Sequence, residues 1–305
     1  MRHRLTDAAY AGGWSVVRHL PEGVADRSFR TLADQAWRRR GRGVAQLERN
    51  LARVVPDATS DELRELSREG MRSYLRYWRE VFRLSDLTRQ QIVDGFTLDG
   101  QDLLAETLAS GRGVVVPLPH SGNWDLAGAW FTLTHARLTT VAERLQPESL
   151  FERFLAFRRS LGMEVLPLTG GEGPYGTLLD RLRGGGLVAL LGDRDLTRAG
   201  VPVTFFGEPT RMPAGPAALA LASGAALLPA TLWFDGRMSR GRIHPEVRPP
   251  GTGTKAERVA AMTQSVADVF AREIAVHPHD WHMLQRLWVA DLDPARTARW
   301  DEAGS

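Results

Sequence analysis

The stretch VVVPLPHSGNWDLAGAW, residues 114–130, combines a short apolar run with two prolines, a histidine and an aspartate. The run is rich in β-branched valine, which is typical of a buried strand. The prolines interrupt a regular strand or helix, and the apolar spacing from Trp124 onward indicates a helix. His120 and Asp125 are therefore predicted to lie on a strand-to-helix turn, at the sheet edge where ligands bind in open α/β folds.

Strand-like and helix-like patterns alternate through the rest of the chain. Strands are predicted near residues 113–118, 138–142, 163–168, 186–191, 226–233 and 242–248, and helices near 124–135, 148–160, 174–183 and 213–223. A last helix begins at Thr254, where Glu257 completes a capping box. This alternation favours an α/β fold with a central mixed, partly parallel sheet flanked by helices.

The first third of the chain has a helical pattern instead. Within residues 1–92, Thr59 and Glu62 form a predicted capping box, and an aromatic-rich apolar stripe follows at helical spacing, typical of a buried helix face. We therefore expect a single domain, 1–305, in which residues 1–92 form a helical amino-terminal cap on an α/β core of residues 93–305.

The charge is distributed unevenly along the chain. Residues 1–83 hold 17 arginines and 11 acidic residues, net +6, whereas the remainder holds 22 basic and 25 acidic residues, net −3. A basic cap predicts a polyanionic partner such as an anionic membrane surface. The alternative is a merely solvated face, because 38 of the 39 basic residues are arginine and the bias extends over the whole chain. No nucleic-acid-reading motif accompanies the arginines, so we expect no nucleic-acid partner.

Several classes of protein are excluded by what the sequence lacks. It contains no cysteine, which excludes disulfides, thiolate catalysis and thiolate metal sites. It has no run of 18 apolar residues, so no membrane span is expected. Its first residues include Asp7 and two glycines in place of a clean apolar run, and we therefore expect no cleaved signal peptide.

The residue types at positions 120 and 125 indicate acid–base chemistry. Histidine exchanges a proton near neutral pH, and a neighbouring carboxylate fixes its tautomer and stabilises the imidazolium. Ser121 is a poor candidate nucleophile, because adjacent side chains rarely face one another and no G-x-S-x-G sequence surrounds it. The pattern therefore predicts that His120 activates a hydroxyl group of a substrate and that Asp125 orients it.

Two other functions remain open at this point. The sequence HPHDWH, residues 277–282, contains residue types that bind zinc. However, the helical spacing of Trp281, Leu284 and Trp288 predicts a helix there, which would place only His279 and His282 on one face. The second alternative is a lipid carrier that binds acyl chains without catalysis, which the intact His120 and Asp125 disfavour.

The motif HSGNWD resembles the His-four-residues-Asp motif of the glycerolipid and lipid A acyltransferases. Later segments resemble the lipid A late-acyltransferase branch, namely GDRDL at 192–196, VTFFGEPTRMPAGPAALA at 203–220 and PHDWHMLQRLW at 278–288. The amino-terminal segments LTDAAYAGGW and LERNLARV are most similar to actinobacterial phosphatidylinositol mannoside acyltransferases. Pro119 before the histidine and the lack of an F-P-E-G block differ from the glycerol-phosphate branch. The lack of an amino-terminal membrane anchor differs from the lipid A enzymes.

This resemblance implies a glycerolipid-acyltransferase-like fold and transfer of a palmitoyl-type chain from acyl-CoA to a mannose hydroxyl of a phosphatidylinositol carrying one or two mannoses. His120 would take the hydroxyl proton, Asp125 would orient it, and backbone N–H groups of residues 121–124 would stabilise the oxyanion. Asp193, favoured over Asp195, would assist catalysis. The other site residues expected are Glu143, Arg158, Asn123, Trp124, Arg194 and Asp195 for substrate, and Arg198 and Arg211 for the CoA phosphates.

The remaining expectations concern the acyl chain and the surroundings of the enzyme. An apolar slot is expected beside the alanine-rich segment 214–222, although such a helix can also simply pack closely. No metal or cofactor is expected, with acyl-CoA acting as donor substrate. We expect a monomer at the cytoplasmic face of the cell membrane, attached peripherally through residues 1–83. Another glycolipid or a lysophospholipid is the alternative acceptor.

Overall fold

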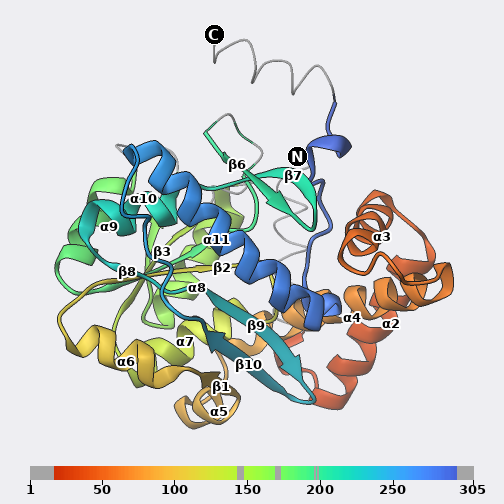
Figure 1. Cartoon of the computed structure of the whole chain (residues 1–305). Helices are drawn as coiled ribbons and strands as arrows, with labels where there is room; N and C mark the ends of the chain where they lie inside the picture. Colours follow the sequence, from red (N-terminus) through yellow and green to blue (C-terminus); the bar gives the residue numbers. More distant parts are fainter. Residues whose placement is uncertain (1–16, 143–147, 169–172, 196, 198, 294–305) are drawn as a thin grey trace.

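The computed structural model of the protein describes residues 17–142, 148–168, 173–195, 197 and 199–293, and Figure 1 shows helices clustered at the amino-terminal end of this chain. The clustered helices are α2 (Glu22–Arg38), α3 (Arg42–Val54) and α4 (Ser60–Leu84), whereas α5 (Arg89–Asp94) packs against α7 (Trp124–Thr134) and β1 (Phe96–Asp99) of the core. The capping box predicted at Thr59 is present. The Thr59 hydroxyl accepts a hydrogen bond from the backbone N–H of Glu62, and the Glu62 carboxylate accepts one from the Thr59 backbone N–H. Leu47, Leu51 and Met71 are buried where α2, α3 and α4 meet.

A five-stranded sheet forms the centre of the α/β core, with the strand order β4-β3-β5-β2-β8. Every pairing in it is parallel. The strands are β2 (Val114–Leu118), β3 (Leu138–Ala142), β4 (Glu164–Pro167), β5 (Leu187–Leu191) and β8 (Ala226–Leu227). Parallel strands require crossover connections, and helices supply them here, as predicted from the alternating pattern.

Both faces of the central sheet are covered (Figure 1). Along β2, Val114 and Val116 belong to one buried apolar cluster, whereas Val115 belongs to the other, as expected for side chains that alternate between the faces of a strand. The flanking helices are α6 (Gln101–Ala109), α7 (Trp124–Thr134), α8 (Glu148–Ser160), α9 (Tyr175–Arg183), α10 (Gly215–Ser223) and α11 (Lys255–Val276).

A second sheet packs beside α7 and gives the fold its mixed character. It contains β1 (Phe96–Asp99), β10 (Met238–Ile243) and β9 (Ala230–Asp235), with β1 and β10 parallel and β10 and β9 antiparallel. A separate antiparallel hairpin joins β6 (Val201–Phe205) to β7 (Glu208–Met212). The mixed, partly parallel α/β fold predicted from the sequence is therefore confirmed.

Two predicted strands and one predicted helix were placed wrongly. The run 226–233 is divided into β8 and β9 around Pro229, which lacks the N–H needed to continue a strand ladder. The strand predicted at 242–248 ends at Ile243, before a segment that contains three prolines. The helix expected from His279 onward is replaced by two short 3-10 turns, Pro278–Asp280 and Val289–Asp291.

The carboxyl-terminal segment is extended because its polar groups bond to other parts of the core. Trp281 forms an isolated antiparallel bridge with Ser121, and Trp288 forms one with Thr210. Across the described residues, no helix is both long and apolar enough to cross a membrane.

Candidate active site

The turn from β2 to α7 is held in one conformation by its own side chains. Asn123 caps α7, with its Oδ1 accepting from the Leu126 N–H at 2.9 Å and its Nδ2 donating to Glu80 of α4 at 2.8 Å. Gly122 has φ +57°, and a Cβ there would lie 2.8 Å from the Leu232 backbone. Only glycine fits this conformation and this close approach, so the turn has a fixed shape.

His120 bonds to a carboxylate from the neighbouring strand. The register pairs Leu118 of β2 with Leu191 of β5, so residues two positions further along each strand, His120 and Asp193, meet at the carboxyl edge of the sheet. His120 Nδ1 lies 2.6 Å from Asp193 Oδ1, and the His120 backbone N–H donates to Oδ2 at 3.0 Å. Asp193 is fully buried, whereas the His120 side chain is 35% exposed. This pairing assigns the proton to Nδ1 and makes Nε2 the basic nitrogen.

The pKa of Asp193 lies below its ordinary value despite complete burial. Burial by itself would raise that pKa, but the charge of His120 and the hydrogen bonds donated to the carboxylate lower it. Asp193 therefore stays ionised, the form that orients an imidazole and stabilises it once protonated.

Asp125 does not occupy the orienting position that the sequence suggested. Its Oδ1 accepts from Arg158 Nε at 2.6 Å, and its Oδ2 accepts from the Tyr77 hydroxyl at 2.8 Å. The expectation that Asp125 orients His120 is therefore replaced by a pairing with Arg158. The physical reason is that Asp125 lies in the first turn of α7, which directs it toward α4 and α8, while Asp193 occupies the position beside His120.

The pair of Asp125 and Arg158 is almost completely enclosed, with side chains 1% and 18% exposed. Burial alone would lower the pKa of the Arg158 guanidinium, but the Asp125 charge and hydrogen bonds raise it above its ordinary value. Burial raises the pKa of Tyr77 well above its ordinary value, and the Asp125 charge adds to this rise. Arg158 and Tyr77 therefore both stay protonated at neutral pH.

Aromatic rings pack between the cap and the turn. Trp124 stacks on Tyr77 with ring centroids 4.0 Å apart and meets the His120 ring edge-on at 5.7 Å. Tyr77 lies on α4, so the helical cap supplies part of the site wall. The sequence reasoning missed Tyr77 because its aromatic neighbours at helical spacing indicated only a buried helix face.

The carboxyl-terminal segment supplies further groups that the sequence reasoning did not place in the site. Trp281 Nε1 donates to Asp193 Oδ2 at 3.0 Å, and the His282 N–H donates to the His120 carbonyl at 2.8 Å. Ser73 of α4 donates to Asp280 Oδ1 at 2.6 Å and lies 2.9 Å from His282 Nε2. Burial lowers the pKa of His282 to about 3, so this imidazole is neutral. The cluster of polar residues in HPHDWH is the sequence feature that could have placed this segment in the site. In the sequence analysis it indicated a metal site as an alternative instead.

An apolar cavity of about 110 Å³ begins at the same edge of the sheet. Trp124, Asp125 and Arg158 line it there, and Leu187, Ala189 and Leu191 line it along the whole of β5. Four residue steps of a strand extend about 13 Å, so the cavity follows the sheet inward. Its other walls come from α7 and from the second sheet, through Gly128, Phe131, Phe96, Leu98 and Leu232.

None of residues 214–222 lines this cavity. The slot expected beside that segment is therefore not part of it. Pro216, Ala217, Leu219 and Ala220 of α10 are buried, and the last three belong to the apolar cluster that contains Phe270 of α11. The small side chains of α10 therefore serve close helix packing, which was the alternative interpretation of this segment.

The other predicted site residues are distributed around GDRDL and β7. Asp195 Oδ1 accepts from the Thr197 N–H at 2.9 Å, and its own N–H donates to the Arg211 carbonyl at 3.0 Å. Arg194 lies directly after Asp193, between the two aspartates. Glu143 and Arg198 lie outside the described residues.

Neither the serine nor the zinc alternative finds support. Ser121 is buried and lines a small separate cavity with Thr231, Glu273 and His277. Within the part of the chain that the structure describes, no three His, Asp or Glu side chains form a group that could hold a metal ion.

Comparison with known proteins identifies the family. A family model described as bacterial lipid A biosynthesis acyltransferase matches residues 1–290. A phosphatidylinositol mannoside acyltransferase of Mycolicibacterium smegmatis is 49% identical over 297 residues, which cover 97% of this chain and 95% of that protein. A phosphatidylinositol mannoside acyltransferase of Mycobacterium tuberculosis is 51% identical over 300 residues, covering 96% of this chain and 92% of that protein. The chain therefore belongs to the family of bacterial lipid A biosynthesis acyltransferases.

Proposed function

We propose that the protein transfers a long acyl chain from acyl-CoA to a mannose hydroxyl of a phosphatidylinositol mannoside. The observation that carries this proposal is the shared sheet edge, where the His120 ring of the His120–Asp193 pair contacts Trp124, which also lines an apolar cavity. A base that can activate a hydroxyl next to a slot for an alkyl chain suits acyl transfer between a thioester and an alcohol. The names of the similar mycobacterial proteins support the mannosylated acceptor.

In the proposed reaction, His120 Nε2 takes the proton of the acceptor hydroxyl as its oxygen attacks the thioester carbonyl. Asp193 holds the opposite ring nitrogen and stabilises the imidazolium. The tetrahedral intermediate then expels the CoA thiolate, which receives the proton from His120. Of the backbone N–H groups of residues 121–124, those of Ser121 and Gly122 already donate to Pro119 and Asp280. The oxyanion role is therefore assigned to the backbone N–H groups of Asn123 and Trp124.

The direct test mixes the purified protein with palmitoyl-CoA and mannosylated phosphatidylinositol. Free thiol should appear in step with a lipid product that is heavier by one palmitoyl group and carries it on mannose, as mapped by fragmentation in a mass spectrometer. A lysophospholipid offered in parallel tests the alternative acceptor, and its exclusive acylation would overturn the mannoside assignment. Binding of acyl-CoA without any thiol release would instead indicate a carrier.

We further propose that the acyl chain occupies the apolar cavity, and Gly128 provides a test. This glycine lies one turn after Trp124 on α7, and a Cβ there would lie 2.8 Å from Met163 Cε. Gly128→Val should fill the middle of the cavity and displace about three methylene groups, each contributing about 0.8 kcal/mol. We expect kcat/KM for palmitoyl-CoA to fall roughly 10–100-fold while shorter donors are less affected.

The matched control for this variant is Gly176→Val on α9. Gly176 is exposed, and nothing lies within 4 Å of the position that its Cβ would take. It should therefore keep the chain-length preference of the original protein. An unchanged preference in Gly128→Val, measured with a series of acyl-CoA donors, would place the acyl chain outside the cavity.

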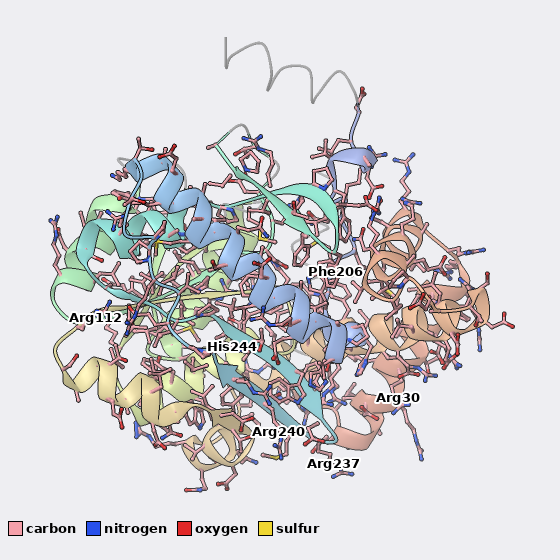
Figure 2. All side chains as sticks on the ribbon, in the orientation of Figure 1. Arg30, Arg112, Phe206, Arg237, Arg240 and His244 are labelled. Carbon is pink, nitrogen blue, oxygen red and sulfur yellow. The ribbon has the colours of Figure 1, made fainter. Side chains whose placement is uncertain are left out.

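We propose that the amino-terminal cap contacts the cytoplasmic face of the cell membrane. Arg27, Arg30, Arg38, Arg39 and Arg42 are exposed on α2 and at the start of α3, and Figure 2 labels Arg30 at the outside of the cap. Val24 and Leu32 of α2 are 47% and 51% exposed, which adds apolar surface to the basic face. The sequence also suggests shallow insertion of Trp14, Val16 and Val17 into the lipid, but Val17 is buried, which corrects that expectation for this residue. Trp14 and Val16 lie outside the described residues.

Substitution of Arg38, Arg39 and Arg42 by glutamine should weaken binding to phosphatidylinositol vesicles. Each arginine near an anionic surface contributes about 1 kcal/mol, so the loss should be roughly 100-fold at low salt. Salt at about 0.5–1 M should release the original protein, and neutral vesicles should bind it little. Arg40 is kept because its guanidinium donates to Glu48.

The control removes the same charge from the α/β core, through Arg137, Arg159 and Arg183, which are also exposed. Flotation of vesicles with each variant measures the binding. Equal loss in the two triple variants, or equal binding to neutral and anionic vesicles, would contradict the membrane role of the cap.

A further inference from the structure

The segment Asp280–His282 is joined by backbone hydrogen bonds to the turn from β2 to α7 that carries His120. The Gly122 N–H donates to the Asp280 carbonyl at 3.0 Å, and the His282 N–H donates to the His120 carbonyl at 2.8 Å. Trp281 lies between these bonds and bridges Ser121 in antiparallel fashion. A segment about 160 residues away in sequence thus fixes the backbone position of His120.

The side chain of Trp281 reaches the other member of the pair. It is fully buried, and its Nε1–H donates to Asp193 Oδ2 at 3.0 Å. Three N–H groups therefore surround the Asp193 carboxylate: the backbone and Nδ1 of His120, and the indole of Trp281. Of these three, the indole is the one that His120 does not supply, and it packs against Phe205 and Trp288 at centroid distances of 6.0 and 6.1 Å.

We propose that Trp281 is a positioning residue for the proposed acyl transfer: its indole N–H holds Asp193 in the orientation that accepts from His120 Nδ1 and sets how strongly Asp193 supports the imidazolium. This role rests on the proposed function, because it acts on the base of that reaction. Trp281 contacts neither acyl-CoA nor acceptor in this assignment, and it acts only through Asp193.

The direction of the effect follows from the sharing of charge. Each donor to a carboxylate withdraws negative charge, and this weakens the attraction between that carboxylate and a neighbouring cation. Without the indole N–H, Asp193 would attract a proton on His120 more strongly, so the apparent pKa of His120 should rise. Other titratable groups around the turn should change little. Burial keeps His282 neutral with a pKa of about 3, His279 lies beside Asp280, and Asp125 is paired with Arg158.

The test substitutes Trp281 by phenylalanine, which keeps an aromatic ring in the core and removes the N–H. The matched control is Trp288→Phe, because Trp288 is equally buried in the same cluster and its Nε1 donates to the Phe205 carbonyl at 2.9 Å. For Trp281→Phe, the acid limb of the pH profile of kcat/KM should move upward by roughly half a pH unit. For Trp288→Phe, stability should fall but the acid limb should stay in place.

A second measurement does not depend on acyl transfer. The imidazole signal of His120, assigned by its loss in His120→Gln, is titrated by NMR in each variant. A rise in the pKa of His120 in Trp281→Phe, but not in Trp288→Phe, supports the positioning role. This result would stand even if no acceptor were acylated, an outcome that would overturn the proposed function separately. Equal titration in the original protein and both variants would overturn the inference. If Trp281→Phe does not fold, benzothienylalanine at position 281 keeps both rings, replaces the N–H by sulfur and should give the same shift.

Discussion

Replacement of His120 by alanine should lower kcat for acyl transfer by about 10²–10⁴-fold, the range that a positioned general base contributes. The expected cause is loss of the group that takes the acceptor proton, because His120 Nδ1 is already held by Asp193 at 2.6 Å. Acyl-CoA affinity should change little, since the imidazole acts on the acceptor. Thiol release under saturating donor, together with equilibrium binding of acyl-CoA, separates the two effects.

Asp193→Asn extends this prediction to the second member of the pair. An asparagine amide can present its NH₂ group to Nδ1 and so favour the wrong tautomer of His120, which should reduce kcat about as severely as removal of the base. Asp180→Asn on α9 is the matched control, because Asp180 is exposed and lies outside the proposed site. It should retain activity within a few-fold. A fully active His120→Ala enzyme, or equal losses in the two asparagine variants, would rule out this assignment of the base and its partner.

Local pattern predicted most of the core around these residues. The valine run, the prolines and the helical spacing after Trp124 correctly located β2, the turn and α7. The capping boxes at Thr59 and Thr254 correctly marked the starts of α4 and α11. Each of these features depends on residues close together in sequence, and for that reason a single sequence can reveal it.

The partner of His120 could not be predicted in the same way. Both Asp125 and Asp193 were expected at the sheet edge, but the choice between them depends on the register of β2 against β5, which pairs Leu118 with Leu191. Register between strands about 70 residues apart is a property of the assembled sheet. Without strand order, proximity in sequence favours the wrong aspartate.

The carboxyl-terminal segment shows a second limit. The apolar spacing of Trp281, Leu284 and Trp288 suggested a helix, but the structure gives Trp281 an extended conformation. Its neighbours Asp280 and His282 form backbone hydrogen bonds with Gly122 and His120 in the turn from β2 to α7. These tertiary contacts override a weak local preference for helix. The metal alternative for HPHDWH had a different origin, because it came from the residue types alone and the predicted helix argued against it.

The position of Asp125 predicts a large effect on stability. Asp125→Asn leaves the Arg158 guanidinium buried without its carboxylate partner, and removal of one member of a buried ion pair typically costs about 3–5 kcal/mol. Arg158 Nε and Nη2 donate to the two oxygens of Asp125 at 2.6 and 3.2 Å, and the Tyr77 hydroxyl donates to one of them. Urea denaturation at neutral pH should show this loss in the free energy of unfolding.

The pairing itself is tested by a double-mutant cycle. Arg158→Met removes the cation and leaves an apolar chain in the cavity wall, and the Asp125→Asn/Arg158→Met variant should be less destabilised than the sum of the two single variants. Because Asp125 does not hold His120, the folded fraction of Asp125→Asn should keep the acid limb of its pH profile at the original pH. A displaced acid limb with unchanged unfolding free energy would instead restore Asp125 as the orienting carboxylate and return Arg158 to a peripheral role. The two aspartates should thus differ in kind, because loss of Asp193 impairs the chemistry in a folded protein and loss of Asp125 impairs the fold that supports it.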